Sequence, residues 1–221
     1  MLLWVHATAA ETSTCFGTHE KGRLEHGVRL PDEGSNFESY SSIARTLGRT
    51  YVHSRVREVV VDAYTGLEQT APGKKFKYGE TGLAEGGEFK PHKTHQNGLS
   101  VDFFVPVVDS NGMSVVLPTS PLNKWGYSIE FDERGKYDDY TIDFEALAQH
   151  LVALHRASVK HGVGIRRVIF DPKLQPLLLR TVEASYLRAN LKLQQQRSWV
   201  RHDEHYHVDF TVKCKRLNAK D

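Results

Sequence analysis

The sequence predicts an α+β fold in which helices pack on a sheet dominated by antiparallel pairing. Two segments repeat apolar residues at helical spacing, and several short runs are rich in β-branched and aromatic residues. No internal repeat, linker or low-complexity tract separates these segments. We therefore expect residues 11–221 of the 221-residue chain to form a single domain.

The first ten residues resemble the back half of a secretory signal. Ala7 and Ala9 have the small size and spacing of a cleavage site, but the basic start and the apolar stretch of roughly 7 to 15 residues are missing. Residues 1–10 are interpreted either as a residual export signal or as a disordered N-terminus. Residues 11–41 follow with closely spaced glycines and little periodicity, which predicts an irregular loop segment.

Two amphipathic helices are expected over residues 51–70 and 143–161. The first repeats valines and Leu67 at helical spacing and stops before Pro72-Gly73, and the second ends at Gly162. Strands are expected at five runs, namely 76–78, 99–107, 127–131, 165–170 and 206–212. Residues 111–124 and 132–143 are interpreted as loop insertions.

The composition, with 39% hydrophobic and 25% charged residues, is that of an ordinary globular protein. Every apolar run, such as residues 1–5, is far shorter than the roughly 20 residues of a membrane-spanning helix, so no integral membrane segment is expected. The net charge of +2 and the short basic runs at 73–77 and 213–216 do not indicate a nucleic-acid partner. The sequence does not indicate an oligomeric state.

Two cysteines, Cys15 and Cys214, lie near opposite ends of the chain. In an oxidising compartment they could pair only with each other, and closing so long a loop stabilises by roughly 4 to 5 kcal/mol on the entropic model. Two free thiols in a reducing compartment remain the alternative. A structural zinc site built on cysteines is excluded, because no other cysteine exists.

The sequence contains 12 histidines, and they are unevenly distributed. Five fall in two tight groups that each border a predicted strand: His92 and His95, then His202, His205 and His207. The others are interpreted as surface or capping residues: His6, His19, His26, His53, His150, His155 and His161.

Strand geometry brings part of the two groups together. His205 and His207 have the same parity and share a strand face, whereas His202 can join them only from a turn before the strand. Gly98 permits a sharp turn through which His95 and Asp102 can converge. Two imidazoles and one carboxylate are the ligand set of a catalytic zinc, which keeps its fourth position open for water.

Two simpler interpretations remain open. A strand histidine is more often a structural residue than a metal ligand. A structural zinc could also be held by four histidines, namely His92, His95, His202 and His205, although structural sites favour cysteine thiolates.

The stretch from His95 to Asp102, together with His205-Tyr206-His207, resembles the zinc signature of the LAS peptidases, which group lysostaphin-type enzymes, D-alanyl-D-alanine peptidases and the hedgehog fold. The penicillin-insensitive murein endopeptidases are more similar still. Their pattern of His-x-x-His, Gly-Leu-x-Val-Asp and His-x-x-His-x-His is matched in order by residues 92–95, 98–102 and 202–207. Residues 22–31 and 167–172 extend the resemblance over most of the chain.

This resemblance implies an LAS-type peptidase fold with one Zn²⁺ held by His95, Asp102 and His207. It implies that His202 and His205 are catalytic and that His92 lines the site. Asp209 has the strand parity of His207, so it could orient one imidazole through its second nitrogen or form a salt bridge.

At Glu204 the sequence departs from the pattern of the murein endopeptidases. It lies three residues before His207, where the related dipeptidases and carboxypeptidases carry their general base. In a regular strand Glu204 would point away from His205 and His207, so a histidine base is preferred and Glu204 is the alternative catalytic residue.

The predicted function is hydrolysis of peptide cross-links in peptidoglycan by a zinc-dependent endopeptidase of the periplasm, with peptide stems as substrate. Similar chains are associated with type VI secretion clusters, where such an enzyme would clear a path through the wall. The alternatives are a D,D-carboxypeptidase and a wall-binding module that keeps the metal without catalysis. His-Glu-x-x-His, Gly-x-Ser-x-Gly and Ser-x-x-Lys motifs are absent from the sequence.

Overall fold

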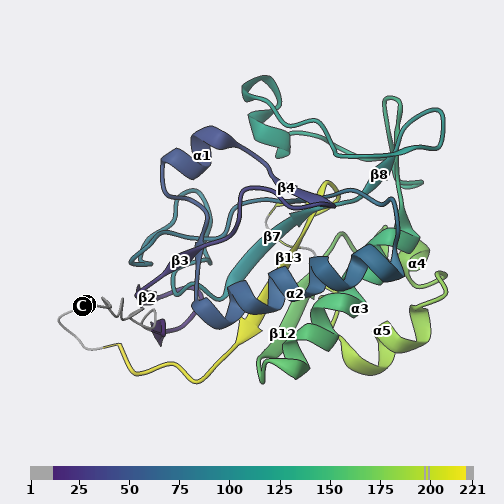
Figure 1. Cartoon of the computed structure of the whole chain (residues 1–221). Coiled ribbons are helices and arrows are strands. Elements are labelled where there is room, and N and C mark those ends of the chain that lie inside the picture. Colours follow the sequence, from purple (N-terminus) through teal and green to yellow (C-terminus); the bar gives the residue numbers. More distant parts are fainter. Residues whose placement is uncertain (1–11, 197, 199, 218–221) are drawn as a thin grey trace, which may run out of the picture.

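The computed structural model describes residues 12–196, 198 and 200–217 (Figure 1). Its largest sheet has five strands in the order β12-β13-β7-β6-β4. They are β12 (Gly164–Ile169), β13 (His205–Thr211), β7 (Ser100–Phe104), β6 (Phe76–Tyr78) and β4 (Phe37–Ser39). All neighbours are antiparallel except β4 and β6, so the predicted α+β class with antiparallel-rich pairing is confirmed.

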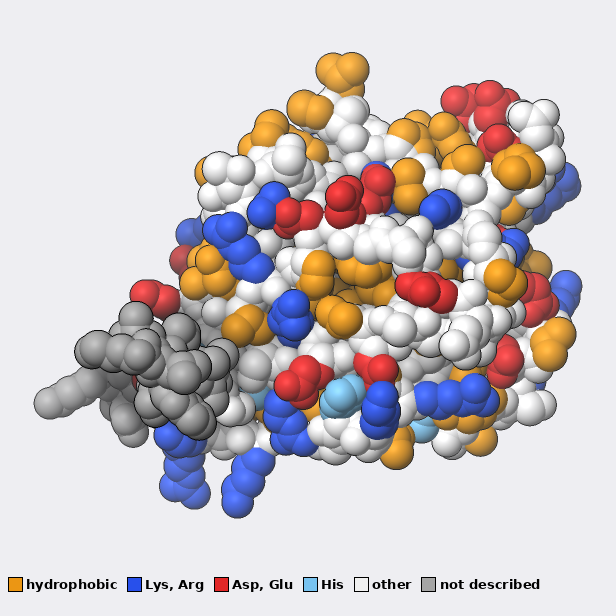
Figure 2. Space-filling model, viewed as in Figure 1, with side chains coloured by type: hydrophobic (Ala, Val, Ile, Leu, Met, Phe, Trp, Pro, Cys, Tyr) orange, Lys and Arg blue, Asp and Glu red, His pale blue; other side chains and the backbone are white. Residues whose placement is uncertain are grey.

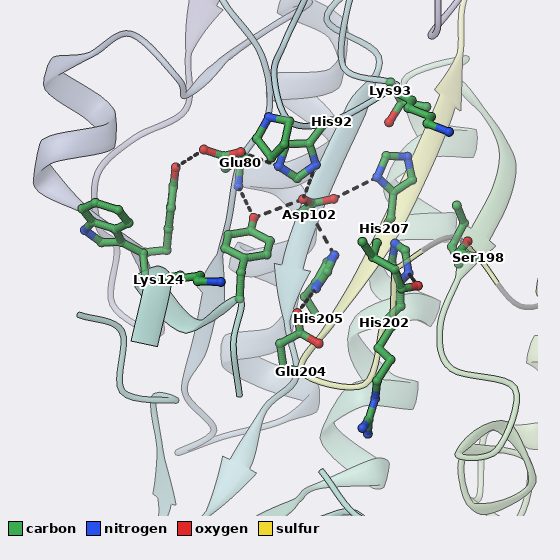
Figure 3. A pocket seen from close by; sticks show the side chains of 18 of the residues that line it. Glu80, His92, Lys93, Asp102, Lys124, Ser198, His202, Glu204, His205 and His207 are labelled. Atoms are coloured by element: carbon green, nitrogen blue, oxygen red, sulfur yellow. Dashed lines mark hydrogen bonds and ion pairs between the residues drawn. The ribbon is translucent and has the colours of Figure 1, made fainter. Parts of the chain in front are cut away.

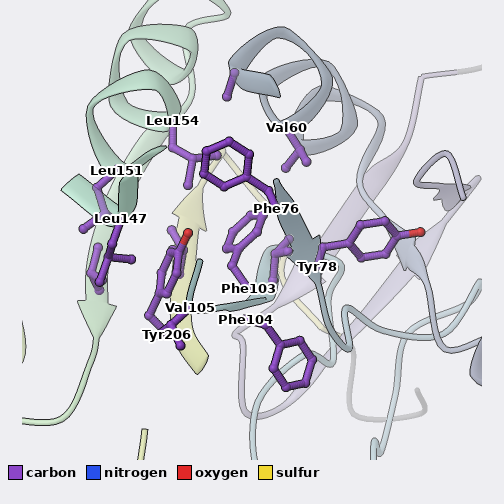
Figure 4. Close-up of a cluster of buried hydrophobic side chains, with 14 of the residues drawn as sticks. Val60, Phe76, Tyr78, Phe103, Phe104, Val105, Leu147, Leu151, Leu154 and Tyr206 are labelled. Carbon is purple, nitrogen blue, oxygen red and sulfur yellow. The ribbon is translucent and has the colours of Figure 1, made fainter. Parts of the chain in front are cut away.

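Two long helices cover one face of this sheet, α2 (Ser54–Thr70) and α3 (Phe144–Lys160) (Figure 1). Both were expected from their apolar periodicity. α2 starts later than predicted because Tyr51–Val52 forms strand β5 and His53 caps the helix by accepting from Arg55 N. Figure 4 shows Val60 of α2 and Leu147 of α3 packed around Phe76, Phe103 and Tyr206 of the sheet.

His150 belongs to this core, so its assignment to the surface was wrong. It is 1% exposed, and its ring stacks on Tyr64 with 4.9 Å between centroids. The reason is its place on α3 beside Leu147 and Leu151, on the buried face of that helix. His19 is also buried, where its Nε2 donates to Phe210 O at 2.9 Å.

Three smaller sheets complete the fold. β1 (Thr14–Gly17) pairs with β2 (Gly22–Glu25), and β3 (Val28–Arg29) pairs with β5. The third has the order β10-β11-β8-β9, with β10 (Lys136–Tyr137), β11 (Tyr140–Ile142), β8 (Val107–Val108) and β9 (Ser114–Val115).

Several expected elements differ from the structure. Residues 11–41 are not wholly irregular, because β1 to β4 lie there and glycines serve as hairpin ends, as where Gly17 pairs with Gly22. Residues 127–131 form no strand, since Lys124, Trp125 and Gly126 have positive φ and Tyr127 N donates back to Lys124 O. Residues 132–143 are not a bare loop, because they contain the hairpin β10–β11.

Four short helices were not predicted: α1 (Ser42–Thr46), the 3₁₀ segment η1 (Pro121–Gly126), α4 (Gln175–Leu178) and α5 (Ala184–Asn190). Each is too short to show the apolar periodicity of a long helix. Among the described residues, no helix combines the length and apolar character needed to cross a membrane.

The cysteines Cys15 and Cys214 form a disulfide that ties β1 to the segment after β13. Residues 1–10, the proposed residual signal or disordered N-terminus, lie outside the described residues. Basic and acidic side chains are interspersed over the face shown in Figure 2, in keeping with the small net charge of +2.

Candidate active site

The candidate site lies on the sheet face opposite α2 and α3, where β7 and β13 run side by side. His207 is the register partner of Asp102, and His205 is the partner of Phe104. Because directly opposed residues of an antiparallel pair share a face, Asp102, His205 and His207 project together, as Figure 3 shows. The residues between them, such as Phe103 and Tyr206, enter the core instead.

His95 reaches this face from the loop before β7. The turn depends on two residues with left-handed backbone, His95 (φ 70) and Gly98 (φ 75), and a Cβ on Gly98 would lie 2.8 Å from His53 N. His95 Nδ1 donates to Thr81 O at 2.9 Å, which leaves Nε2 facing Asp102 Oδ1 at 3.4 Å. His95 is fully buried, and its Nε2 has no hydrogen-bond partner among the described residues.

His207 lies between two carboxylates. Its Nδ1 is 2.8 Å from Asp102 Oδ1, and its Nε2 donates to Asp209 Oδ1 at 2.7 Å. Asp209 is buried and also accepts from Ser100 Oγ at 2.7 Å and from Arg167 Nε at 2.6 Å. Both roles foreseen for Asp209, orienting an imidazole and forming a salt bridge, therefore occur together.

The electrostatics of the site favour positive charge beside Asp102. Burial raises the pKa of the Asp102 carboxyl, but His95, His205 and His207 outweigh it and hold that pKa well below its usual range. Burial lowers the pKa of His207, yet the charges of Asp209 and Asp102 raise it to about 10. A cation is therefore well matched to this cluster.

The donor atoms are close enough to hold a metal. One nitrogen each of His92 and His95 and an oxygen of Asp102 lie within 4.8 Å of one another, and His207 contacts the same carboxylate from β13. His92 differs from His95 because its Nε2 is already 2.6 Å from Glu80 Oε2, while its Nδ1 is 4.0 Å from Asp102 Oδ2. Imidazoles and a carboxylate are ligands that suit zinc, and the unpartnered Nε2 of His95 fits a ligand atom.

His202 lies in the bend before β13, as strand parity required of it. Its ring centroid is 4.7 Å from that of His205 and 6.5 Å from that of His207. Burial and the neighbouring histidines lower the pKa of His202 to about 3. The histidines predicted from sequence to meet here, His202, His205 and His207, therefore lie close together.

Glu204 does not point away from His205, and that expectation was wrong. It precedes the first residue of β13, so strand alternation does not govern it, and His205 Nδ1 donates to Glu204 Oε1 at 2.8 Å. His205 Nε2 lies 3.9 Å from Asp102 Oδ2. Burial lowers the pKa of His205, but Glu204 and Asp102 outweigh it and the pKa is raised.

Two residues of the site were missed by sequence reasoning. Tyr127 donates from its hydroxyl to Asp102 Oδ2 at 3.1 Å and accepts from Glu80 N at 3.0 Å. Glu80 holds His92 and is itself bound by Tyr40 at 2.8 Å and by Arg49 Nη2 at 2.8 Å. Burial raises the pKa of Glu80, but Arg49 and His92 lower it to about 2. No spacing rule links either residue to the histidine groups.

The cluster opens into a cleft of about 950 Å³. Its lining includes His92, Asp102, His202, Glu204, His205 and His207 together with residues of α1 and η1. The side chains of the candidate site are therefore reached from solvent through this cleft.

The sequence matches the penicillin-insensitive murein endopeptidase family over residues 15–220. The chain belongs to this family. The match spans nearly the whole chain, including both histidine groups, and confirms the resemblance seen in the sequence. A murein endopeptidase hydrolyses peptide bonds of peptidoglycan, so the family identifies the reaction class and the substrate. No curated protein matches the chain in sequence.

Proposed function

We propose that this murein endopeptidase is zinc-dependent and that it hydrolyses peptide cross-links of peptidoglycan in the periplasm, with zinc held by His95, Asp102 and His207. The observation that carries the proposal is the buried Nε2 of His95, which has no hydrogen-bond partner in the described part of the chain and faces Asp102. An uncompensated buried polar nitrogen is costly unless a ligand satisfies it. His92 is assigned to the cleft wall, because Glu80 already holds its Nε2.

Neighbouring hydrogen-bonding groups fix the three proposed ligands. Thr81 O fixes the ring of His95, Asp209 fixes that of His207, and Tyr127 holds the Oδ2 of Asp102. Partners of this kind select the ligating nitrogen and the ring orientation. Zinc held there would polarise a carbonyl oxygen and would lower the pKa of a bound water toward neutrality.

His205 is proposed to transfer the proton. Glu204 accepts from its Nδ1, so the Nε2 of His205 is the nitrogen that faces Asp102 and the cleft. From there it can take a proton from the attacking water and return it to the leaving amine. His202, next to His205, lies where a protonated imidazole could stabilise the developing oxyanion.

Glu204 is proposed to position His205 rather than to act as the base itself. Its carboxylate accepts the hydrogen bond from the His205 ring. A carboxylate at Nδ1 fixes the tautomer of the histidine and stabilises the imidazolium that forms during proton transfer.

The periplasmic location is supported by the bond between Cys15 and Cys214. Disulfides persist in oxidising compartments such as the periplasm and are rare in the bacterial cytosol. Peptidoglycan, the substrate of the family, is reached from the same compartment.

Digestion of purified muropeptides, followed by mass spectrometry, tests this function. Conversion of cross-linked dimers to monomers by the native chain, but not by the His205→Ala variant, is the expected result. Loss of a single alanine from monomers would instead identify a D,D-carboxypeptidase. Unchanged muropeptides with zinc still bound would identify a wall-binding module.

A further inference from the structure

The segment η1, on the wall of the cleft, contains two consecutive non-glycine residues in the left-handed region. They are Lys124 (φ 51, ψ 43) and Trp125 (φ 55, ψ 40). Side chains disfavour this backbone, which persists where the surrounding structure imposes it and which is concentrated at functional sites.

Hydrogen bonds impose the conformation. Asn123 Oδ1 accepts from Ser120 N and from Gly126 N, each at 2.8 Å, and Trp125 N donates to Ser120 O at 2.6 Å. A Cβ on Gly126 would lie 2.5 Å from Phe104 Cε1, so the segment is pressed against β7. The next residue, Tyr127, contacts Asp102. The strained residues are therefore fixed relative to the proposed zinc ligands.

This backbone presents Lys124 to the cleft. Lys124 is one of the lining residues, and Figure 3 shows its side chain beside the labelled cluster. Trp125 is partly buried against the core and also lines the cleft.

Lys124 differs from other basic residues that line the cleft. Four of these pair with carboxylates of the fold: Arg49 with Glu80, Lys90 with Glu88, Arg167 with Asp209 and Arg201 with Asp203. Within the described residues the Lys124 ammonium has no hydrogen bond and no ion pair. Its charge and its three donors are therefore available to a ligand in the cleft.

We propose that Lys124 is a specificity-determining residue that binds a carboxylate of the peptidoglycan stem peptide near the scissile bond. This proposal rests on the proposed function, because it takes the cleft to hold a stem peptide. Stem peptides carry free carboxylates on acidic residues and at their C-termini. The fixed backbone limits the region that the Lys124 side chain can reach, and its ammonium can form charge-assisted hydrogen bonds to a carboxylate there.

The test measures the dissociation constants of muropeptide dimers by calorimetry, in a His205→Ala background in which turnover is slowed. Lys124→Met is expected to raise the dissociation constant about tenfold, which corresponds to about 1.4 kcal/mol, whereas Lys124→Arg stays near the parent value. Lys173→Met is the control, because Lys173 pairs with Glu133 and is absent from the cleft lining.

Amidated dimers identify the carboxylate that is bound. One set carries carboxamides on the acidic side chains and the other carries them at the C-terminus. If one amidated set binds to the protein with Lys124 and to the Lys124→Met variant with the same affinity, that set lacks the carboxylate that Lys124 recognises. The ratio of the dissociation constants for the amidated and the unmodified dimers should be smaller in Lys124→Met than in the protein with Lys124. If the two ratios are equal, the proposal is wrong.

The two proposals fail in different ways. Cleavage of dimers by the native chain, without any effect of Lys124→Met on binding, contradicts only the role of Lys124. Charge-selective binding that depends on Lys124, without cleavage by the native chain, contradicts only the endopeptidase function.

Discussion

His205 has different partners at its two ring nitrogens, and this difference leads to a prediction. Nδ1 donates to Glu204, and Nε2 lies 3.9 Å from Asp102 Oδ2. His205→Ala is therefore expected to keep its zinc and to lose roughly 10²- to 10⁴-fold in activity, the usual contribution of a positioned acid or base. Zinc content and turnover should be measured on the same preparations.

Two other outcomes would change the assignment. Loss of zinc from His205→Ala would make His205 a ligand. Retention of both zinc and full activity would make Glu204 the leading general base, as in the carboxypeptidase branch of the superfamily.

Asp209 accepts a hydrogen bond from Nε2 of the proposed ligand His207, at 2.7 Å. Asp209→Asn weakens that contact and the ion pair with Arg167, so the affinity for zinc is expected to fall about 10- to 100-fold. Competition with a chromophoric chelator measures this affinity, and thermal unfolding checks that the variant folds. Asp132→Asn, at an exposed turn, is the control. An unchanged affinity would show that Asp209 serves only the fold.

Strand alternation and the turn at Gly98 predicted part of the arrangement of the candidate site. The alternation of strand residues places His205 and His207 on one face, and Gly98 indicated the turn that brings His95 toward Asp102. Glu80 and Tyr127 could not be found this way, because only tertiary packing brings them to His92 and Asp102.

At the scale of elements, α3 carries a titratable group into the core. Burial lowers the pKa of His150 to about 3, whereas an exposed histidine titrates near 6.5. Below about pH 6.5 the unfolded chain binds a proton that the folded chain does not, so this residue lowers stability as the pH falls toward 3.

The substitution His150→Gln removes the titratable imidazole, and the glutamine side chain can still contact the Tyr206 hydroxyl. Between about pH 6 and pH 4, the free energy of unfolding should fall less steeply, by up to about 1.4 kcal/mol per pH unit. Urea unfolding at several pH values measures the slope. His155→Gln, at a partly exposed position of α3, should change it less. An unaltered slope in His150→Gln would contradict the burial of a neutral imidazole.

Long elements were easier to predict than short ones. The apolar periodicity of α2 and α3 spans several turns, so both were located from sequence within a few residues. The hairpin β1–β2 has only four residues in each strand, and the glycines at its ends are equally typical of irregular loops.

At the scale of the whole molecule, the strand that carries His205 and His207 lies inside the main sheet. β13 is flanked by β12 and β7, and the segment after it is tied to β1 through Cys15 and Cys214. The two histidine groups are over 100 residues apart in sequence, and the pairing of β7 with β13 joins them. The proposed zinc site is therefore built on the best supported part of the fold.

The zinc content of purified protein tests the central claim most directly. Elemental analysis of the native chain is expected to give about one zinc per chain. His207→Ala should lose the metal, whereas Glu204→Ala, at the residue beside His205, should retain it. A native chain that binds no metal after gentle purification and zinc reconstitution would contradict the account.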